Sequence, residues 1–451
     1  MAELRPFRGV HFNPQSLPDL GRVLAPPYDV LSPQDRADLE ARSPYNVVRL
    51  LLGELAWDHS PSVDKYQECA RLWREWQDQG VMVRDDKPAF YLYRQRFLSE
   101  GDSYTRLGLI ALVKLEPYSA GVVLPHEQTF PKAKEDRYRL LSACGANFDS
   151  IYGLYDDPEG KVRSALTAME KSAPVLKASL DGQEQALWPI TDPAVQEVLS
   201  RELADTVITI ADGHHRYETA LKYRDDQGAA DDPTRPEAWV MMTLSSIQDP
   251  GLVVLPTHRL VEVTYDGREP NLAQTIATVR EVANKRFDVQ EAGPVPHLLS
   301  RMCEYARRGQ GALGVYFGES TGEVIPPGHQ TEGPFANSTS HDFGDSLSFV
   351  LRCKDGGGEA RATDILRLHR EILDKLQDAL GAVRITVTYT HSVGEAVGQV
   401  RAGNCQMAFL LNPVPVEEVY RTAQAGKKMP EKSTYFYPKL TSGVVLRPLD
   451  E

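Results

Sequence analysis

The residues with the clearest chemical potential stand together in the run 212–216, which reads Asp-Gly-His-His-Arg. The β-branched segment 206–210 before it is predicted to be a strand, and a helix is predicted to follow it. Glycine lets a backbone pass close to a ligand, and the first N–H groups of a helix have no intrahelical partners. His214, His215 and Arg216 add donors at the positive end of the helix dipole. This strand, turn and helix are therefore predicted to bind phosphate and to take part in catalysis.

Two other interpretations of this turn stay open. Asp212 followed by Gly213 is a common helix start, so Asp212 could merely cap a helix whose histidines are exposed. His214 and Glu218 stand four residues apart, which is a usual spacing for metal ligands. No second pair of histidines or carboxylates follows at a defined spacing, so we expect no dedicated metal site. Mg²⁺ that arrives with a nucleotide needs few protein ligands and suits the turn better.

The segment 125–129 offers a carboxylate upstream of the turn. Glu127 stands beside His126 in a proline-flanked turn, after an apolar strand predicted at 106–115 and before several basic residues. A carboxylate next to a phosphate pocket has the properties required of a general base for a hydroxyl nucleophile. A surface turn with a solvated glutamate explains the same residues equally well.

Three further runs combine polar and aromatic residues towards the two ends of the chain. Residues 429–439 contain Lys432 and Lys439 among hydroxyl and aromatic side chains, and the other two runs are 26–29 and 45–49. Each run could close a phosphate pocket or pack as ordinary structure with its charges outside. Residue types alone slightly favour the structural interpretation for all three.

The length of 451 residues exceeds one ordinary core and indicates two or three domains. The pattern of predicted helices and strands changes near residue 265. We expect an N-terminal segment 1–104, a core at 105–265 and a C-terminal α/β domain at 266–451. Further strands are expected at 89–93, 239–244 and 314–317, and helices from 33 onward and at 63–79, 133–143 and 271–285.

Composition and charge exclude several classes of protein. A net charge of −13 opposes a duplex nucleic-acid partner, because such binding draws on Lys and Arg. No apolar run approaches the ~18 residues of a membrane helix, and the first residues lack the apolar core of a signal peptide. The five cysteines show no C-x-x-C spacing and suit a reducing compartment. We therefore expect a cytoplasmic protein without nucleic-acid or membrane partners.

One glycine pattern, at 309–314, matches G-x-G-x-x-G without its usual setting. It is predicted to follow a helix and precede a strand, which is the reverse of the dinucleotide-binding arrangement. The sequence contains no G-x-x-x-x-G-K-[ST] loop, no protein-kinase signature set and no G-x-S-x-G. Any phosphoryl chemistry must therefore use a different scaffold.

Five runs along the chain carry a family resemblance. They are Pro-Pro-Tyr-Asp-Val at 26–30, Asn-Val-Val-Arg-Leu at 46–50, Pro-His-Glu at 125–127, Ala-Asp-Gly-His-His-Arg-Tyr at 211–217 and Lys-Ser-Thr-Tyr-Phe-Tyr-Pro-Lys at 432–439. Together they resemble the bacterial family known as domain of unknown function 1015, over nearly the whole chain. The central part more distantly resembles the ParB/sulfiredoxin superfamily. The resemblance implies a mixed α/β fold, with a ParB/sulfiredoxin-like core and additional N- and C-terminal α/β segments.

The superfamily resemblance implies roles for individual residues. Members place nucleotide phosphates on a turn of the type G-[C/H/E]-x-R at a helix start, which corresponds here to residues 213–216. Free-serine kinases of the group carry Asp-Gly-His-x-Arg and an upstream glutamate that acts on the substrate hydroxyl, a role implied for Glu127. Sulfiredoxin chemistry needs a cysteine where His214 stands and is excluded. ParB-type proteins add a helix-turn-helix DNA reader, which this sequence lacks.

We therefore expect a small-metabolite kinase that transfers phosphoryl from ATP or ADP, with Mg²⁺, to a hydroxyl, and free L-serine is the first acceptor to consider. A phosphatase or nucleotide hydrolase with water as the nucleophile stays an alternative, as does a non-catalytic nucleotide-sensing module. A homodimer is an open alternative to a monomer. The expected site residues are Glu127, His214 and Asp212 for catalysis, Gly213, His214, His215, Arg216, Lys432 and Lys439 for the nucleotide, and His126, Thr129 and Arg49 for the substrate.

Overall fold

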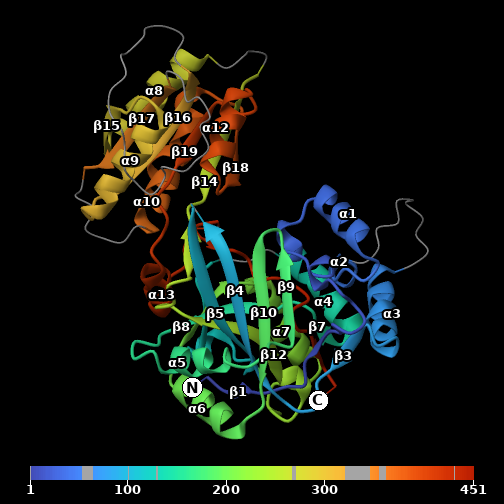
Figure 1. Cartoon of the computed structure of the whole chain (residues 1–451). Helices are drawn as coiled ribbons and strands as arrows, with labels where there is room; N and C mark the ends of the chain where they lie inside the picture. The colour runs from blue at the N-terminus through green and yellow to red at the C-terminus, as the bar shows by residue number, and fades with distance from the viewer. Residues whose placement is uncertain are drawn as a thin grey trace. The chain divides into compact units, whose positions relative to one another are not determined.

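The computed structural model of the chain describes residues 2–52, 64–99, 101–127, 131–266, 271–319, 346–354, 362–430 and 432–450. The chain divides into two compact units (Figure 1). Unit 1 comprises Met1–Val253, Thr422–Lys428 and Pro438–Glu451, and unit 2 comprises Val254–Arg421 and Met429–Tyr437. The C-terminal segments of the polypeptide therefore belong again to the unit in which the chain begins.

A mixed sheet forms the centre of unit 1. Within the described residues its strands are β1 (Leu4–Arg5), β4 (Phe90–Ser99), β5 (Asp102–Lys114), β6 (Val123–Pro125), β8 (Ile151–Tyr155), β9 (Leu176–Leu180), β10 (Gln183–Ile190), β11 (Ile208–Asp212) and β12 (Trp239–Ser246). Their order is β6-β11-β8-β12-β5-β4-β10-β9, and β1 pairs with β5. Two short pairs accompany the sheet, β2 (Val10–Phe12) with β3 (Met82–Arg84) and β7 (Ala146–Asn147) with β21 (Arg447–Pro448).

Helices cover both faces of this sheet, because alternate side chains of its strands point to opposite sides. On β5, Ile110 and Leu112 belong to one apolar cluster, whereas Leu109 and Ala111 belong to another. Residues of α2 and α3 enter the first cluster, and residues of α5, α6 and α7 enter the second. The helices of unit 1 are α1 (Pro33–Arg42), α2 (Val48–Leu52), α3 (Lys65–Asp78), α4 (Pro131–Cys144), α5 (Lys161–Met169), α6 (Pro193–Ala204) and α7 (His214–Asp226).

Unit 2 is built on an antiparallel sheet. Its described strands are β14 (His258–Thr264), β15 (Phe287–Glu291), β16 (Ala312–Glu319), β17 (Ser346–Cys353), β18 (Arg384–Thr390) and β19 (Met407–Leu410), in the order β15-β17-β16-β19-β14-β18. The remaining strands, β13 (Val253–Leu255) and β20 (Tyr435–Tyr437), form a ribbon. The other helices are α8 (Leu272–Asn284), α9 (Val295–Arg307), α10 (Ala362–Arg367), α11 (Asp374–Leu380), α12 (Val393–Arg401) and α13 (Val416–Gln424).

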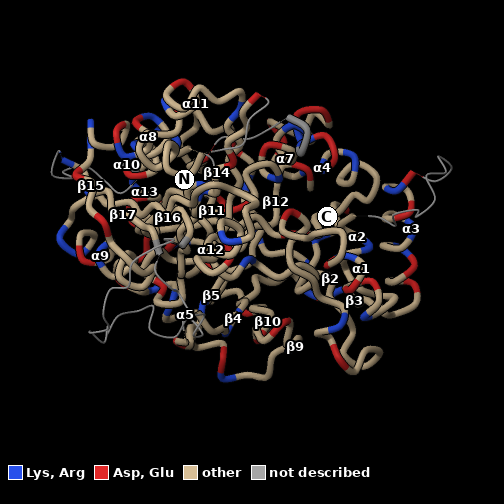
Figure 2. Tube along the Cα trace, turned by 90° about the horizontal axis from the view of Figure 1, so that it is seen from above, with Lys and Arg blue, Asp and Glu red and all other residues tan. Residues whose placement is uncertain are grey.

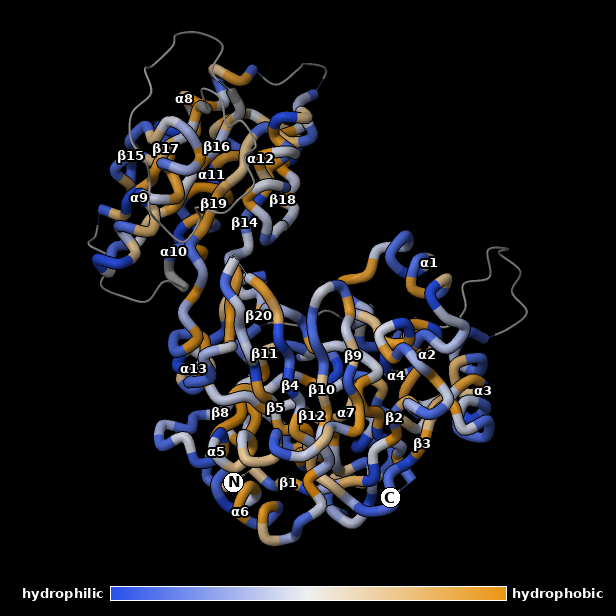
Figure 3. Tube along the Cα trace, in the orientation of Figure 1, coloured by the Kyte–Doolittle hydropathy of each residue, from blue (hydrophilic) through white to orange (hydrophobic). Residues whose placement is uncertain are grey.

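Apolar residues of α9 and α12 pack on one face of the sheet of unit 2. Leu298 and Met302 of α9 join Val397 and Val400 of α12 in one buried cluster with residues of β16 and β19. Figure 3 shows the corresponding concentration of hydrophobic residues on these strands. Burial of each such side chain contributes about 1.5–3 kcal/mol, so this face holds much of the stability of the unit.

Charged residues of both signs are interspersed along both units, as Figure 2 shows. The net charge of −13 is therefore spread over the trace rather than gathered in one segment. Among the helices in the described part of the chain, none is both long enough and apolar enough to cross a membrane.

The mixed α/β fold expected from the sequence is confirmed. The glycine pattern at 309–314 connects α9 to β16, as predicted. The strand expected at 206–210 begins two residues later, because Thr206 donates its backbone N–H and its hydroxyl to the carbonyl of Leu203 and so extends the turn that ends α6. The hairpin of β9 and β10 was not predicted.

The two units differ from the three segments expected. The expected boundary between residues 104 and 105 lies inside β5, which pairs with β4 along most of its length, so residues on both sides of it share unit 1. The assignment of 105–265 as a nucleotide-binding core of its own stays a prediction.

Candidate functional site

The run 212–216 lies at one edge of the central sheet of unit 1, where three chain segments meet. Strands β6 and β11 are parallel, with Pro125 opposite Ile210, so both end at this edge. Strand β8 runs antiparallel to β11, with Tyr152 opposite Asp212, so β8 begins there. The topology therefore places Glu127, the turn after β11 and the residues before β8 side by side.

Gly213 makes the sharp turn from β11 into α7. Its φ of 91° is strained for residues with a side chain, and a Cβ at this position would lie 2.9 Å from the Arg216 guanidinium. The backbone N–H of Tyr217 is the first of α7 to reach a carbonyl of this turn, that of Gly213, at 3.0 Å. The N–H groups of residues 214–216 therefore precede the first intrahelical hydrogen bond at the amino end of a thirteen-residue helix.

Asp212 does not cap this helix, so the capping interpretation is wrong. Gly213 occupies the N-cap position, and no side chain caps it. The Asp212 carboxylate instead accepts from Arg216 Nη2 at 2.8 Å and forms an ion pair with Lys439. Glycine can serve here because the helix start is directed at the edge of the sheet, where a ligand can supply the acceptors.

Within the group of Asp212, Arg216 and Lys439, each charge stabilises the ionised state of its partners. Burial opposes ionisation of Asp212, but Lys439 and Arg216 outweigh it and lower the pKa of the carboxyl to about 2. Burial likewise opposes the charge of Arg216, yet the carboxylates of Asp212, Asp149 and Asp29 raise its pKa. Arg216 also donates to the carbonyl of Ser150, at 2.8 Å. Asp212, Arg216 and Lys439 therefore stand together at the amino end of α7, with Asp149 and Asp29 near enough to act on Arg216.

Lys439 reaches Asp212 because buried polar residues of the β4–β5 hairpin hold its backbone. Arg106 donates to the carbonyl of Pro438 at 2.6 Å, and Gln95 donates to the carbonyl of Lys439 at 3.2 Å. Arg106 and Gln95 are 2% and 1% exposed, and Arg106 also donates to Gln95. A buried arginine needs such acceptors, so the hairpin and the C-terminal segment stabilise each other.

His126 and His214 pack edge to face, with ring centroids 4.8 Å apart. Nδ1 of His126 donates to the carbonyl of Ile210 at 2.7 Å, because a carbonyl can only accept. The backbone N–H of His126 donates to Nε2 of His214 at 3.3 Å, so this nitrogen carries no proton. Burial lowers the pKa of both imidazoles, and the proximity of His126 lowers that of His214 further. Both rings are therefore neutral near pH 7.

Glu127 lies beside these histidines. Its charge acts on His126 and on His215, where it favours protonation, although burial lowers the pKa of both rings overall. Lys134 of α4 and Glu218 of α7 form an ion pair at 2.7 Å and also act on His215. The structure thus brings the expected base to the same edge of the sheet as the expected phosphate turn.

Two residues of the N-terminal run 26–30 also belong to this edge. Desolvation by neighbouring groups and the charge of Asp212 raise the pKa of Asp29, against Arg216 and Lys439, although Asp29 is exposed to solvent. Burial raises the pKa of Tyr28 to about 12, although Arg216 is among the cations that oppose this. Residue types alone had favoured a structural role for this run, and only its proline-rich, turn-forming pattern indicated a special position.

The structure places the other expected site residues as follows. Arg49 contacts Glu40, whose backbone carbonyl it reaches at 3.2 Å. Lys432 belongs to unit 2, where its carbonyl accepts from Arg259 at 3.2 Å. Thr129 lies outside the described residues. The roles expected for these three residues stay predictions.

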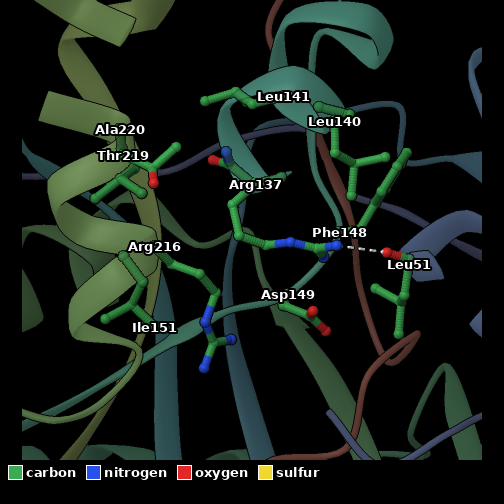
Figure 4. Close-up of a pocket in the computed structure, with 13 residues that line it drawn as sticks. Leu51, Arg137, Leu140, Leu141, Phe148, Asp149, Ile151, Arg216, Thr219 and Ala220 are labelled. Carbon is green, nitrogen blue, oxygen red and sulfur yellow. Dashed lines mark hydrogen bonds between the residues drawn. The ribbon is translucent and has the colours of Figure 1, made fainter. Parts of the chain in front are cut away.

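A cavity of about 60 Å³ lies behind the turn, between α4, α7 and the start of β8 (Figure 4). Arg216 lines it, together with Arg137, Asp149 and a larger number of apolar side chains. The same guanidinium that pairs with Asp212 therefore borders this cavity.

Among the His, Cys, Asp and Glu side chains of the described residues, no group of three or more is arranged to hold a metal ion. Both oxygens of Asp212 are engaged by cations. Mg²⁺ would therefore depend mainly on the phosphate oxygens of a nucleotide.

Several solved structures show a low-scoring likeness to this chain. A conserved hypothetical protein from Pyrococcus furiosus has 15% identity and a TM-score of 0.33, covering 70% of this chain and 90% of its own. A free serine kinase variant in complex with ADP has 15% identity and a TM-score of 0.34, covering 70% and 83%. SbnI from Staphylococcus aureus, with a C-terminal truncation, has 10% identity and a TM-score of 0.33, covering 75% and 87%. With TM-scores below 0.5, these likenesses carry no conclusion about this chain.

None of the curated proteins matches this sequence. A family model does match it, over residues 4–339, and its description is "Protein of unknown function (DUF1015)". The match spans more than half of the 451 residues and includes the runs at 26–30, 125–127 and 211–217. The chain therefore belongs to the DUF1015 family.

Proposed function

We propose that unit 1 is a small-metabolite kinase that transfers a phosphoryl group from ATP or ADP to a hydroxyl. The observation that carries the proposal is the convergence of Lys439 and Arg216 on Asp212, directly at the amino end of α7. Lys439, Arg216 and the positive end of the helix dipole converge there, although the carboxylates of Asp149 and Asp29 also act on Arg216. A phosphate group is the ligand that such a site binds best.

The neutral groups of the site are also compatible with a bound phosphate. His214 and His126 are neutral, so they can form hydrogen bonds at the site without adding charge to it. Donors held in place before the reaction stabilise charge that develops on transferred oxygens without having to reorganise. Arg216 and Lys439 would hold the phosphate oxygens, with the N–H groups of residues 214–216.

Glu127 is the proposed general base. The acceptor hydroxyl would give its proton to the Glu127 carboxylate while its oxygen forms a bond to the terminal phosphorus of the nucleotide. The bond between that phosphorus and the bridging oxygen breaks, and the bridging oxygen leaves with the shortened nucleotide. Positioning by the turn and charge stabilisation by the cations then carry most of the rate enhancement.

Mg²⁺ belongs to the proposal as a partner of the nucleotide. The described residues offer it no preformed set of three ligands, so it would arrive with the phosphates. Asp29 lies at the same edge, within the electrostatic influence of Asp212 and Lys439.

Free L-serine is the first acceptor to test, because the Asp-Gly-His-x-Arg run and the upstream Glu127 resemble those of free-serine kinases. Purified full-length protein would be incubated with L-serine, Mg²⁺ and either ATP or ADP. Formation of phosphoserine that depends on both substrates supports the kinase and identifies the donor. Release of phosphate without any acceptor supports a hydrolase, and nucleotide binding without turnover supports a sensing module, so either result would contradict the proposal.

A further inference from the structure

The cavity behind the turn is lined by charged and apolar side chains, and the proposed phosphate site does not use most of them. Most of its lining is apolar, and its charged side chains are Arg137, Asp149 and Arg216 (Figure 4). Arg216 is already committed to Asp212 and to the carbonyl of Ser150. The binding capacity of the cavity therefore depends on Arg137 and Asp149.

Arg137 is 7% exposed and held in place by several partners. Its Nη2 donates to the carbonyl of Leu51 at 2.9 Å, its Nε donates to Asp136 at 3.0 Å, and its guanidinium lies 4.0 Å from the centroid of the Tyr28 ring. Within the described residues, these hydrogen bonds use Nε and Nη2 and leave Nη1 without an acceptor. A fixed guanidinium with a spare donor is suited to a carboxylate.

Asp149 supplies the opposite charge in the same cavity. Its Oδ1 accepts from the hydroxyl of Ser442, and among the described residues no hydrogen bond reaches its Oδ2. In Figure 4 its carboxylate extends in the same direction as the guanidinium of Arg216. A half-buried carboxylate oxygen at the wall of a cavity is suited to an ammonium group.

The size of the cavity limits the ligand. Since one water molecule needs roughly 10–15 Å³ of such space, a cavity of about 60 Å³ holds about four to six non-hydrogen atoms. That is close to the size of a small α-amino acid, and far below that of a nucleotide. The nucleotide must therefore lie outside the cavity, on the side of Asp212.

We infer that this cavity is the acceptor pocket, and that it takes a small α-amino acid as a zwitterion. The carboxylate would bind Arg137, the ammonium group would bind Asp149, and the side chain would extend past Arg216 towards the phosphate turn. This inference rests on the proposed kinase function for the fate of the hydroxyl, but the binding itself requires no nucleotide.

Calorimetric titration of the full-length protein tests the inference. L-serine would be compared with ethanolamine, which lacks the carboxylate, and with 3-hydroxypropionate, which lacks the ammonium group. We expect L-serine to bind at least about tenfold more tightly than either, because each lost charge leaves the buried Arg137 or the half-buried Asp149 without its ligand partner. Equal affinity for the three compounds, or no binding of glycine, L-serine and L-threonine, overturns the inference.

Substitutions of the two charged lining residues test whether L-serine binds in this cavity. Arg137→Lys and Asp149→Asn should each weaken L-serine binding at least about tenfold, and Asp149→Asn should also abolish the preference for L-serine over 3-hydroxypropionate. Arg139→Lys, on the exposed face of the same helix, and Asp231→Asn, at an exposed position, are the matched controls and should bind like the parent. Unchanged affinity in Arg137→Lys and Asp149→Asn contradicts the assignment.

Titration of ADP into the parent protein separates the two claims. If the parent binds ADP but none of the small amino acids, the pocket is assigned wrongly while the phosphate site stands. If L-serine binding depends on both of its charges but no phosphoserine forms with any nucleotide, the pocket stands and the kinase proposal fails.

Discussion

Lys439 forms an ion pair with Asp212, which lies 227 positions earlier in the chain and ends strand β11. The pair exists because Arg106 and Gln95 hold the backbone of residues 438–439 against the β4–β5 hairpin. It keeps a cation within reach of the amino end of α7. The four predictions below follow from this arrangement and from a buried histidine in unit 2.

Replacement of Lys439 by Met should weaken nucleotide binding. The change removes one of two cations from the proposed phosphate site, and a hydrogen bond to a charged group contributes about 1.5–3 kcal/mol, which corresponds to about 10- to 100-fold in Kd. The pKa of Asp212 should also rise from about 2, because Lys439 is its foremost stabilising partner. Calorimetry with ADP measures the affinity, with Lys427→Met at an exposed position as the control. An unchanged Kd would remove Lys439 from the phosphate site.

Replacement of Gly213 by Ala should cost both stability and binding. The φ of 91° costs about 1–2 kcal/mol for a residue with a Cβ, and that atom would displace the Arg216 guanidinium. Gly228→Ala is a matched control, because Gly228 has a φ of 66° and its added Cβ would meet no atom within 4 Å. Both variants should melt earlier, but only Gly213→Ala should lose ADP affinity. Equal affinity in the two variants would show that Arg216 does not contact the nucleotide.

Replacement of Glu127 by Gln should lower kcat by about 10²–10⁴-fold, because the amide cannot accept the hydroxyl proton. ADP affinity should stay within about twofold, since the phosphate donors are untouched. Glu135→Gln, at an exposed position of α4, controls for the change of net charge. Full turnover in Glu127→Gln would mean that another group is the base, and Asp29 would be the next candidate.

The stability of unit 2 should fall in acid through His258. Burial, followed by Arg259 and His391, lowers the pKa of this 1%-exposed imidazole to about 3, against 6.5 when unfolded. The unfolded chain therefore takes up the proton first, so the stabilisation is complete above pH 6.5 and is lost as the pH falls towards 3. By pH 5 the loss is about 2 kcal/mol.

Urea unfolding at pH 7 and pH 5 measures this loss. His258→Asn is the informative variant, because an asparagine oxygen can replace Nδ1 as the acceptor for the backbone N–H of Leu411, at 3.2 Å in the parent. The variant should lose less stability than the parent between the two pH values. An identical pH dependence would show that other groups dominate acid sensitivity.

Local chemistry explains why part of the site could be predicted. The turn at 212–216 was identified because a β-branched strand, a glycine and a row of donors are neighbours in the sequence. The start of α1 was predicted at residue 33, and the structure adds a capping box of Ser32 and Asp35 there. The hairpin of β9 and β10 was not predicted, although its turn is an Asp-Gly pair, Asp181-Gly182, which is a usual sequence signal of a hairpin. In the structure both residues have the positive φ that such a turn requires.

Long-range packing explains what could not be predicted. Lys439 was only one of two lysines in an aromatic run, and its position depends on buried partners more than 300 residues away in the sequence. Asp29 and Asp149 stand in turns with nothing in their neighbours to distinguish them from solvated acids. Their importance follows from the sheet order, which brings β6, β11 and β8 to one edge.

The return of the C-terminal segment to unit 1 has a consequence for biosynthesis. The nascent polypeptide can form most of the central sheet while residues 254–421 are still being translated, but the turn at 212–216 then lacks Lys439, and Arg106 and Gln95 lack the carbonyls of Pro438 and Lys439. A chain that stops short of residue 438 therefore leaves a buried guanidinium and a buried amide each with one acceptor fewer. Truncated chains of this kind should be unstable, and they should also lack the proposed activity. The same few residues would therefore decide both whether the protein is degraded and whether it is active.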